Sequence, residues 1–140
     1  MSAANELLAA VHARLTGDAQ LTALVGADAI RDRLVSGRKL PSIVIGDLVS
    51  NDYSTSTEAG EEHLLTLEIW SDANGRMRTQ DIAACVFALL HDAPLDLASA
   101  HLVALRHRLT RTRREPKAKL HVAEMRFRAV TEQAPRPPAP

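Results

Sequence analysis

Two long segments near the C-terminus constrain the fold more than any other feature of the chain. Segments His101–Thr112 and Lys119–Thr131 alternate apolar and polar side chains, and this period of two is typical of a β-strand with one buried face. Each spans about 12 residues, against the five or six that are usual for a strand. Because only residues 113–118 separate them, we expect a long C-terminal β-hairpin that projects beyond its sheet.

The alternation assigns the side chains of this hairpin to opposite faces. In the first segment, one face carries Val103, Leu105, His107 and Leu109, and the other carries Ala104, Arg106, Arg108 and Thr110. The apolar residues of the second segment change phase, with Leu120 and Val122 on one side of the change and Met125, Phe127 and Ala129 on the other. A β-bulge inserts one residue and reverses the alternation, so we expect a bulge near Ala123.

Two earlier segments predict a second hairpin. Residues 42–49 form a β-branched apolar run, and residues 62–70 alternate with Leu65, Leu67 and Ile69 on one face. Residues 50–61 between them show no apolar periodicity, which predicts a long polar loop of the kind that is mobile or carries an interaction. Residues 30–34 predict a further, short strand.

Three segments have the signals of helices. The expected helices cover residues 3–16, 18–24 and 74–91, and Ser2 and Asp18 are the expected N-caps of the first two. The apolar positions recur at helical spacing, so each helix has one face to bury. Together with the strands they predict an α+β fold: an antiparallel β-sheet with helices packed on one face.

The length of 140 residues, of which 46% are hydrophobic, fits one domain over residues 1–132 with its own core. The proline-rich residues 133–140 should be disordered. No apolar run approaches the roughly 18 residues that a membrane span needs, so we expect no contact with a membrane. The single cysteine, Cys85, excludes an internal disulfide framework and is typical of a chain that folds in a reducing cytoplasm.

Charge is segregated along the chain, although 17 basic and 17 acidic residues cancel. Residues 40–72 carry acids and no Lys or Arg, whereas residues 106–128 carry a large excess of basic residues. Two interpretations stay open: neighbouring strands pair their charges within one molecule, or oppositely charged faces meet between subunits. The candidate interface residues are Asp52, Glu58, Glu61, Glu62 and Glu68 on the acidic side and Arg106, Arg108, Arg111, Arg113 and Arg114 on the basic side.

No recognisable catalytic, metal or cofactor motif occurs in the chain. The six histidines lack metal-ligand spacing, and the glycines form neither a phosphate loop nor a nucleophile elbow. Cys85 lies on the apolar stripe of its helix and His107 on an apolar strand face, where structural roles are expected. Glu61-Glu62-His63 resembles a catalytic fragment only superficially. Adjacent residues of a strand point to opposite faces, so Glu62 and His63 cannot act together. We therefore expect no enzyme and no cofactor.

The arginine-rich segment 106–114 has two further interpretations. It is either a patch for phosphate or for an acidic protein surface, or a strand edge that charge protects from aggregation. Proteins that read single strands usually stack bases on aromatic side chains, and Phe127 is the only aromatic nearby, on the apolar face. Base-specific recognition is not expected, and non-specific proximity to DNA stays open.

The order of several segments resembles a known family. These segments are Leu40-Pro41-Ser42-Ile43-Val44-Ile45-Gly46-Asp47, residues 62–71, the helix entry at Gly75-Arg76, Leu102-Val103-Ala104-Leu105-Arg106 and Arg126-Phe127-Arg128-Ala129-Val130. Over residues 4–132 they are similar to the tail-terminator (tail-completion) proteins of long-tailed phages and alphaproteobacterial gene transfer agents. One departure is the turn Glu115-Pro116-Lys117-Ala118, where members often carry a glycine.

The resemblance implies a subunit of a ring, hexameric in this family, that caps the head-proximal end of a tail tube. Such a ring stops tube polymerisation, joins the head and lets double-stranded DNA pass through its lumen. The implied partners are further copies of the chain, the tail-tube protein and a head–neck connector or stopper protein, within a phage-like particle assembled in the bacterial cytoplasm. A closed ring needs two different patches on each subunit, and the segregated charges supply such a pair.

Two alternative functions are kept beside this one. A head–neck connector or stopper ring would use the same assembly logic with a different contact surface. A basic-hairpin nucleic-acid-binding module would use the arginine-rich segment alone.

Overall fold

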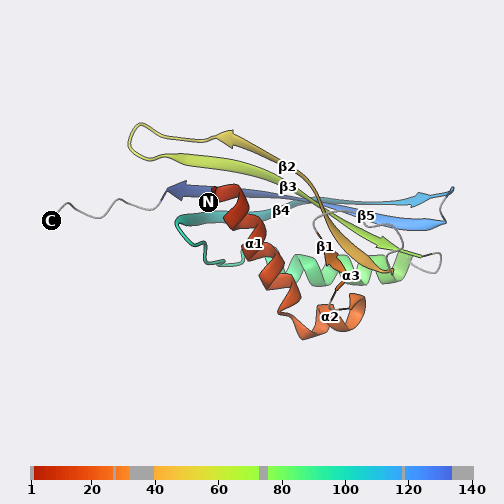
Figure 1. Cartoon of the computed structure of the whole chain (residues 1–140). Helices are drawn as coiled ribbons and strands as arrows, with labels where there is room; N and C mark the ends of the chain where they lie inside the picture. Colours follow the sequence, from red (N-terminus) through yellow and green to blue (C-terminus); the bar gives the residue numbers. More distant parts are fainter. Residues whose placement is uncertain (1, 27, 32–39, 73–75, 118, 134–140) are drawn as a thin grey trace.

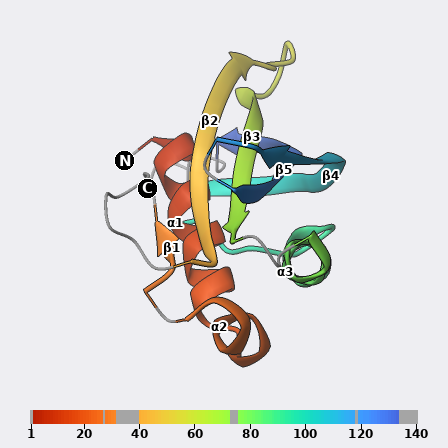
Figure 2. The ribbon, with the colours of Figure 1, turned by 90° about the vertical axis from the view of Figure 1, so that its right-hand side faces the viewer.

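The computed structural model describes residues 2–26, 28–31, 40–72, 76–117 and 119–133. Three helices cover one face of a five-stranded sheet, and the other face, here called the outer face, carries none of the described helices (Figure 1). Turned by 90°, the strands cross one another and show the strong twist of the sheet, α1 lies beside β2, and α2 and α3 lie below (Figure 2). The predicted α+β class is confirmed.

The helices begin and end close to their predicted bounds. They are α1 (Ala3–Thr16), α2 (Ala19–Val25) and α3 (Arg76–Leu90). The Ser2 side chain accepts a hydrogen bond from the Asn5 amide and Asp18 accepts one from Leu21, so both predicted N-caps are confirmed. The predicted start of α3 at residue 74 lies outside the described residues.

The strands are β1 (Ile30–Arg31), β2 (Ser42–Asp52), β3 (Gly60–Ser71), β4 (Ala100–Glu115) and β5 (Leu120–Gln133), in the spatial order β1-β2-β3-β5-β4. The four long strands pair antiparallel, but β1 pairs parallel with β2. The sheet is therefore mixed, and the expectation of an all-antiparallel sheet is wrong at β1. A parallel neighbour needs a connection that returns to the starting end of the sheet, and residues 32–41 separate these two strands.

The loop predicted over residues 50–61 is shorter than expected. Strand β2 continues to Asp52 and β3 begins at Gly60, which leaves only residues 53–59 outside the strands. Backbone pairing needs no apolar side chain, whereas apolar periodicity reports burial alone. The apolar periodicity therefore could not predict the polar ends of these strands.

The core lies between the helices and the inner face of the sheet. Its fully buried large side chains include Leu7 and Leu15 of α1, Leu21 of α2, Ile82 and Leu90 of α3, and Ile43, Leu65, Leu67, Ile69, Leu105, Met125 and Phe127 of the sheet. Each such side chain contributes about 1.5–3 kcal/mol through the apolar surface it removes from water. The predicted inner face of β3 is confirmed.

The bulge expected near Ala123 is absent. Strand β5 pairs with β3 without a shift from Glu132 to His121, and the two register shifts lie instead in β4, at Val103 and Arg108. Val122 is buried on the outer face, opposite Trp70, so β5 carries apolar residues on both faces. The apolar residues of β5 occur at both odd and even positions because both faces of the strand are buried, and no bulge is needed to explain them.

The bulge at Arg108 reverses the alternation of β4 beyond it. Leu109 lies opposite Arg126 on the outer face, and Thr110 lies opposite Met125 on the inner face. Grouping Leu109 with His107, as strict alternation does, is therefore wrong. Arg106 and Arg111, five residues apart, are brought to the same face.

The C-terminal hairpin is confirmed, but it does not project beyond the sheet, because β5 pairs with β3 over residues 121–132. The closed end of the β2–β3 hairpin, at residues 53–59, and the end of the β4–β5 hairpin where β4 stops at Glu115 lie at opposite ends of the sheet (Figure 1). Gln133, predicted to begin a disordered tail, is the last residue of β5. The rest of that predicted tail lies outside the described residues.

Candidate assembly interface

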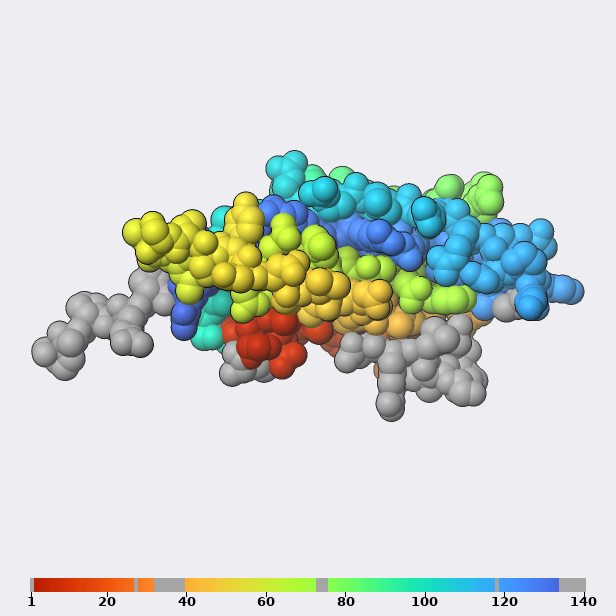
Figure 3. All heavy atoms as spheres, turned by 90° about the horizontal axis from the view of Figure 1, so that it is seen from above, coloured from red at the N-terminus to blue at the C-terminus, as the bar shows by residue number. Residues whose placement is uncertain are grey.

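The outer face of the sheet carries a row of arginines along its edge strand. Figure 3 shows this face, made by β2, β3, β5 and β4 in that order. The register places Arg106, Arg111 and Arg113 on it, and Arg108 occupies the bulge between the first two. Arg106, Arg108 and Arg111 are exposed, and we call these three residues the arginine stripe. Arg114 lies opposite His121 and faces the helix side.

Only one of the five predicted basic interface residues is paired with a carboxylate among the described residues. The Arg113 guanidinium lies 2.8 Å from Glu115 and 4.0 Å from Glu124. No described carboxylate lies within 4.0 Å of the arginine stripe or of Arg114. The stripe is therefore a cationic surface that the described residues leave without a counter-ion.

The predicted acidic residues on the outer face are partly neutralised. Glu62 accepts a 2.6 Å hydrogen bond from Arg128 of β5, which raises the pKa of the Arg128 guanidinium, and that guanidinium also lies 5.3 Å from the centre of the Tyr53 ring. Burial raises the pKa of Glu68, although the nearby Arg113 acts against that shift. The basic segment 106–128 includes part of β5, which pairs with the acidic strand β3, so the Glu62–Arg128 pair confirms in part that neighbouring strands pair their charges within one molecule. Strand β4, which carries the arginine stripe, is separated from β3 by β5.

The remaining predicted acids, Asp52, Glu58 and Glu61, are exposed at the closed end of the β2–β3 hairpin, and we call them the acidic hairpin end. Ser54 donates to the Asp52 carboxylate from its hydroxyl at 2.6 Å and from its amide at 3.1 Å, which lowers the pKa of Asp52. The structure adds Glu132, whose pKa is raised by a hydrogen bond with Glu58. No described Lys or Arg lies within 4.0 Å of these carboxylates.

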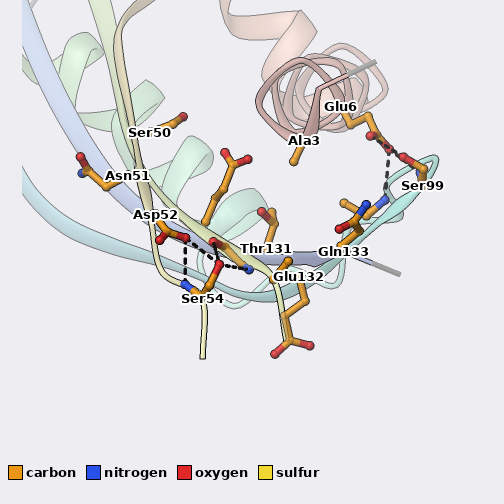
Figure 4. Close-up of a pocket in the computed structure, with 14 residues that line it drawn as sticks. Ala3, Glu6, Ser50, Asn51, Asp52, Ser54, Ser99, Thr131, Glu132 and Gln133 are labelled. Carbon is orange, nitrogen blue, oxygen red and sulfur yellow. Dashed lines mark hydrogen bonds between the residues drawn. The ribbon is translucent and has the colours of Figure 1, made fainter. Parts of the chain in front are cut away.

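A pocket of about 570 Å³ opens beside the acidic hairpin end, between α1 and the start of β4 (Figure 4). Its lining residues include four acids, Glu6, Asp52, Glu61 and Glu132, and no Lys or Arg is among them. Sequence reasoning missed Glu6, which lies in a helix with an ordinary amphipathic pattern. Only the fold brings it beside residues 52, 61 and 132.

Glu6 connects the first turn of α1 to the chain that enters β4. Its carboxylate accepts hydrogen bonds from the Ser99 amide, from the Ser99 hydroxyl at 2.8 Å and from the Ala100 amide at 3.3 Å. These donors, the Ser99 amide foremost, lower the pKa of Glu6. Glu6 is thus held in place as an anion at the wall of the pocket.

Two histidines are built into the sheet. His63 is fully buried between hydrogen bonds to Ser50 of β2 (2.7 Å) and Thr131 of β5 (2.9 Å), and burial lowers its pKa. The His107 amide donates to His91 Nδ1 at 3.0 Å, and the His107 ring packs edge-on against Phe127. The expected structural role of His107 agrees with these contacts.

Cys85 is half-buried against the core, and burial raises the pKa of its thiol. The described residues contain no group of three or more His, Cys, Asp or Glu side chains that could hold a metal ion. Within the same residues, no helix is long and apolar enough to cross a membrane.

Comparison with known proteins identifies the family. Residues 9–132, nearly the whole chain, match the family described as "Tail completion protein gp17". This chain is a member of the gp17 tail completion family. Among solved structures, a chain in the virion of a native gene transfer agent particle is similar, with a TM-score of 0.85 and 33% sequence identity. The match covers 94% of this chain and 98% of that chain. No curated protein matches significantly.

Membership in the tail completion family agrees with the predicted resemblance and makes this chain a structural protein of phage-like tails. The arginine stripe and the acidic hairpin end are accordingly the candidate functional surfaces of this family member.

Proposed function

We propose that copies of this chain form a ring, hexameric by analogy with the family resemblance, that caps the head-proximal end of a phage-like tail tube. The ring stops tube polymerisation, offers the surface that joins the head and lets DNA pass through its lumen. The similarity to a gene transfer agent virion chain over nearly the full length of both chains carries this proposal. The oppositely charged surfaces support it, since a ring needs two different patches on each subunit.

The test is to add the purified chain to polymerising tail-tube protein of the same particle and to measure tube length by electron microscopy. We expect short tubes that each carry a collar at one end. Tubes that grow unchanged, without a collar, would contradict the proposal. Cross-links to portal-side proteins in place of tube protein would assign the chain to the head–neck connector instead.

A further inference from the structure

In the part of the chain that the structure describes, opposite charges remain unneutralised at two places. The arginine stripe has no described carboxylate within 4.0 Å, and the acidic hairpin end has no described Lys or Arg within that distance. The chain as a whole carries 17 basic and 17 acidic residues. Each surface therefore has the charge that the other lacks.

The fold keeps these two surfaces apart within one molecule. Strands β3 and β5 lie between β2 and β4, so β4 is roughly 14 Å from β2 at about 4.8 Å per strand. The register also places Asp52 and Glu61 on the helix side of the sheet, whereas Arg106 and Arg111 lie on the outer face. Among the described residues, neither surface can neutralise the other within one molecule, whereas a second molecule can bring them together.

Both surfaces also expose an apolar side chain. Leu109, between the arginines of the stripe, is 42% exposed, and Tyr53, next to Asp52, is 54% exposed. Exposed ion pairs orient partners more than they hold them, so apolar contact is needed to stabilise such a docking. In the same molecule, Tyr53 already accepts a guanidinium, that of Arg128, against its ring. The chain itself therefore contains an example of an arginine packed against this hairpin end.

We propose that the acidic hairpin end of one copy docks on the arginine stripe of the next copy. The contact joins two different patches, so repetition builds a closed ring or a filament and not a simple pair. The proposal rests on the proposed function and names the subunit contact of that ring. It also divides four of the five predicted arginines: Arg106, Arg108 and Arg111 carry the contact, whereas Arg114, which faces the helix side, does not.

The carboxylates at the hairpin end agree with this assignment. Glu58 and Glu132 are close enough to share a hydrogen bond, which keeps the pKa of Glu132 raised. A guanidinium that approaches this pair would offset its negative charge and favour ionised Glu132.

Complementary charge reversals test the contact. One variant, Arg106→Glu with Arg111→Glu, makes the stripe acidic; the other, Glu58→Lys with Glu61→Lys, makes the hairpin end basic. Each variant alone opposes like charges, and we expect its self-association to weaken at least tenfold, measured by light scattering with and without tail tubes. An equimolar mixture restores opposite charges at every contact, so we expect rings of the wild-type size under the electron microscope.

Arg114→Glu is the matched control for Arg111→Glu alone, because each replaces one arginine of β4 by an acid, on opposite faces of the sheet. We expect its self-association to stay within twofold of the wild type. Circular dichroism of every variant checks that the fold is retained. If Arg114→Glu weakens assembly as much as Arg111→Glu does, the contact lies at the β4–β5 hairpin end and the proposal is wrong.

Three further outcomes would overturn the proposal in distinguishable ways. Folded variants that form wild-type rings without mixing would exclude this contact and leave the proposed ring intact. A wild-type chain that never associates, alone or on tubes, would contradict the proposed function itself. Salt-sensitive binding of duplex DNA that is lost in Arg106→Glu with Arg111→Glu, without any association of copies, would assign the stripe to DNA.

Discussion

Arg106 of β4 lies directly opposite Arg128 of β5 on the outer face of the sheet. Like charges in facing positions destabilise a strand pair, yet this pair lies in the longest hairpin of the molecule. Glu62 binds Arg128 at 2.6 Å from the other side, and so offsets the repulsion for one of the two arginines. Arg106 keeps its charge available to solvent and to a partner.

Glu62→Gln should lower the free energy of unfolding by about 1–2 kcal/mol, because it leaves the half-buried Arg128 without its counter-ion. Urea unfolding followed by circular dichroism measures the change. Glu61→Gln, one residue away and without a Lys or Arg partner among the described residues, is the control and should stay within about 0.5 kcal/mol of the wild type. Equal losses in the two variants would show that the ion pair contributes nothing.

Stability should fall as the pH drops below 6.5, the ordinary pKa of histidine, because burial holds the pKa of His63 below that value. Below pH 6.5 the unfolded chain binds a proton at His63 that the folded chain does not bind. The contribution of neutral His63 to stability is therefore full above pH 6.5 and decreases as the pH falls towards the folded pKa. His63→Gln cannot titrate and should show a weaker pH dependence in urea unfolding between pH 7.5 and 5.5. The exposed His101→Gln should keep the wild-type dependence, and a wild-type dependence in both variants would contradict the prediction.

Glu6→Gln should lower the midpoint of thermal unfolding at pH 7, because the Ser99 and Ala100 amides lose a charged acceptor. The pKa of Glu6 lies below its ordinary value of 4.5, so its contribution is present above that pH and is lost as the pH falls through the folded pKa. The variant should therefore lose less stability than the wild type between pH 7 and pH 3.5. The control Asp96→Asn changes an exposed loop residue and should lose as much stability over this pH range as the wild type. If Glu6→Gln also loses as much stability as the wild type, the Glu6 carboxylate does not have this role.

Local signals predicted much of this fold. Ser2 and Asp18 cap their helices because a cap depends on residues only three positions apart. Leu65, Leu67 and Ile69 face the core because side-chain direction alternates along any strand. The segregation of charge into residues 40–72 and 106–128 can likewise be read directly from the order of residues in the sequence.

The candidate interface needed information that no single segment holds. The sequence by itself determined the helices, the two hairpins and the separation of acidic from basic residues, because caps, periodicity and composition act over a few neighbouring residues. Only the tertiary structure decided that β5 lies between β3 and β4, that the bulge falls at Arg108, and that Arg111 shares a face with Arg106 while Arg114 does not. Strand order and register arise from pairing between distant segments, and one inserted residue exchanges the faces of all that follow.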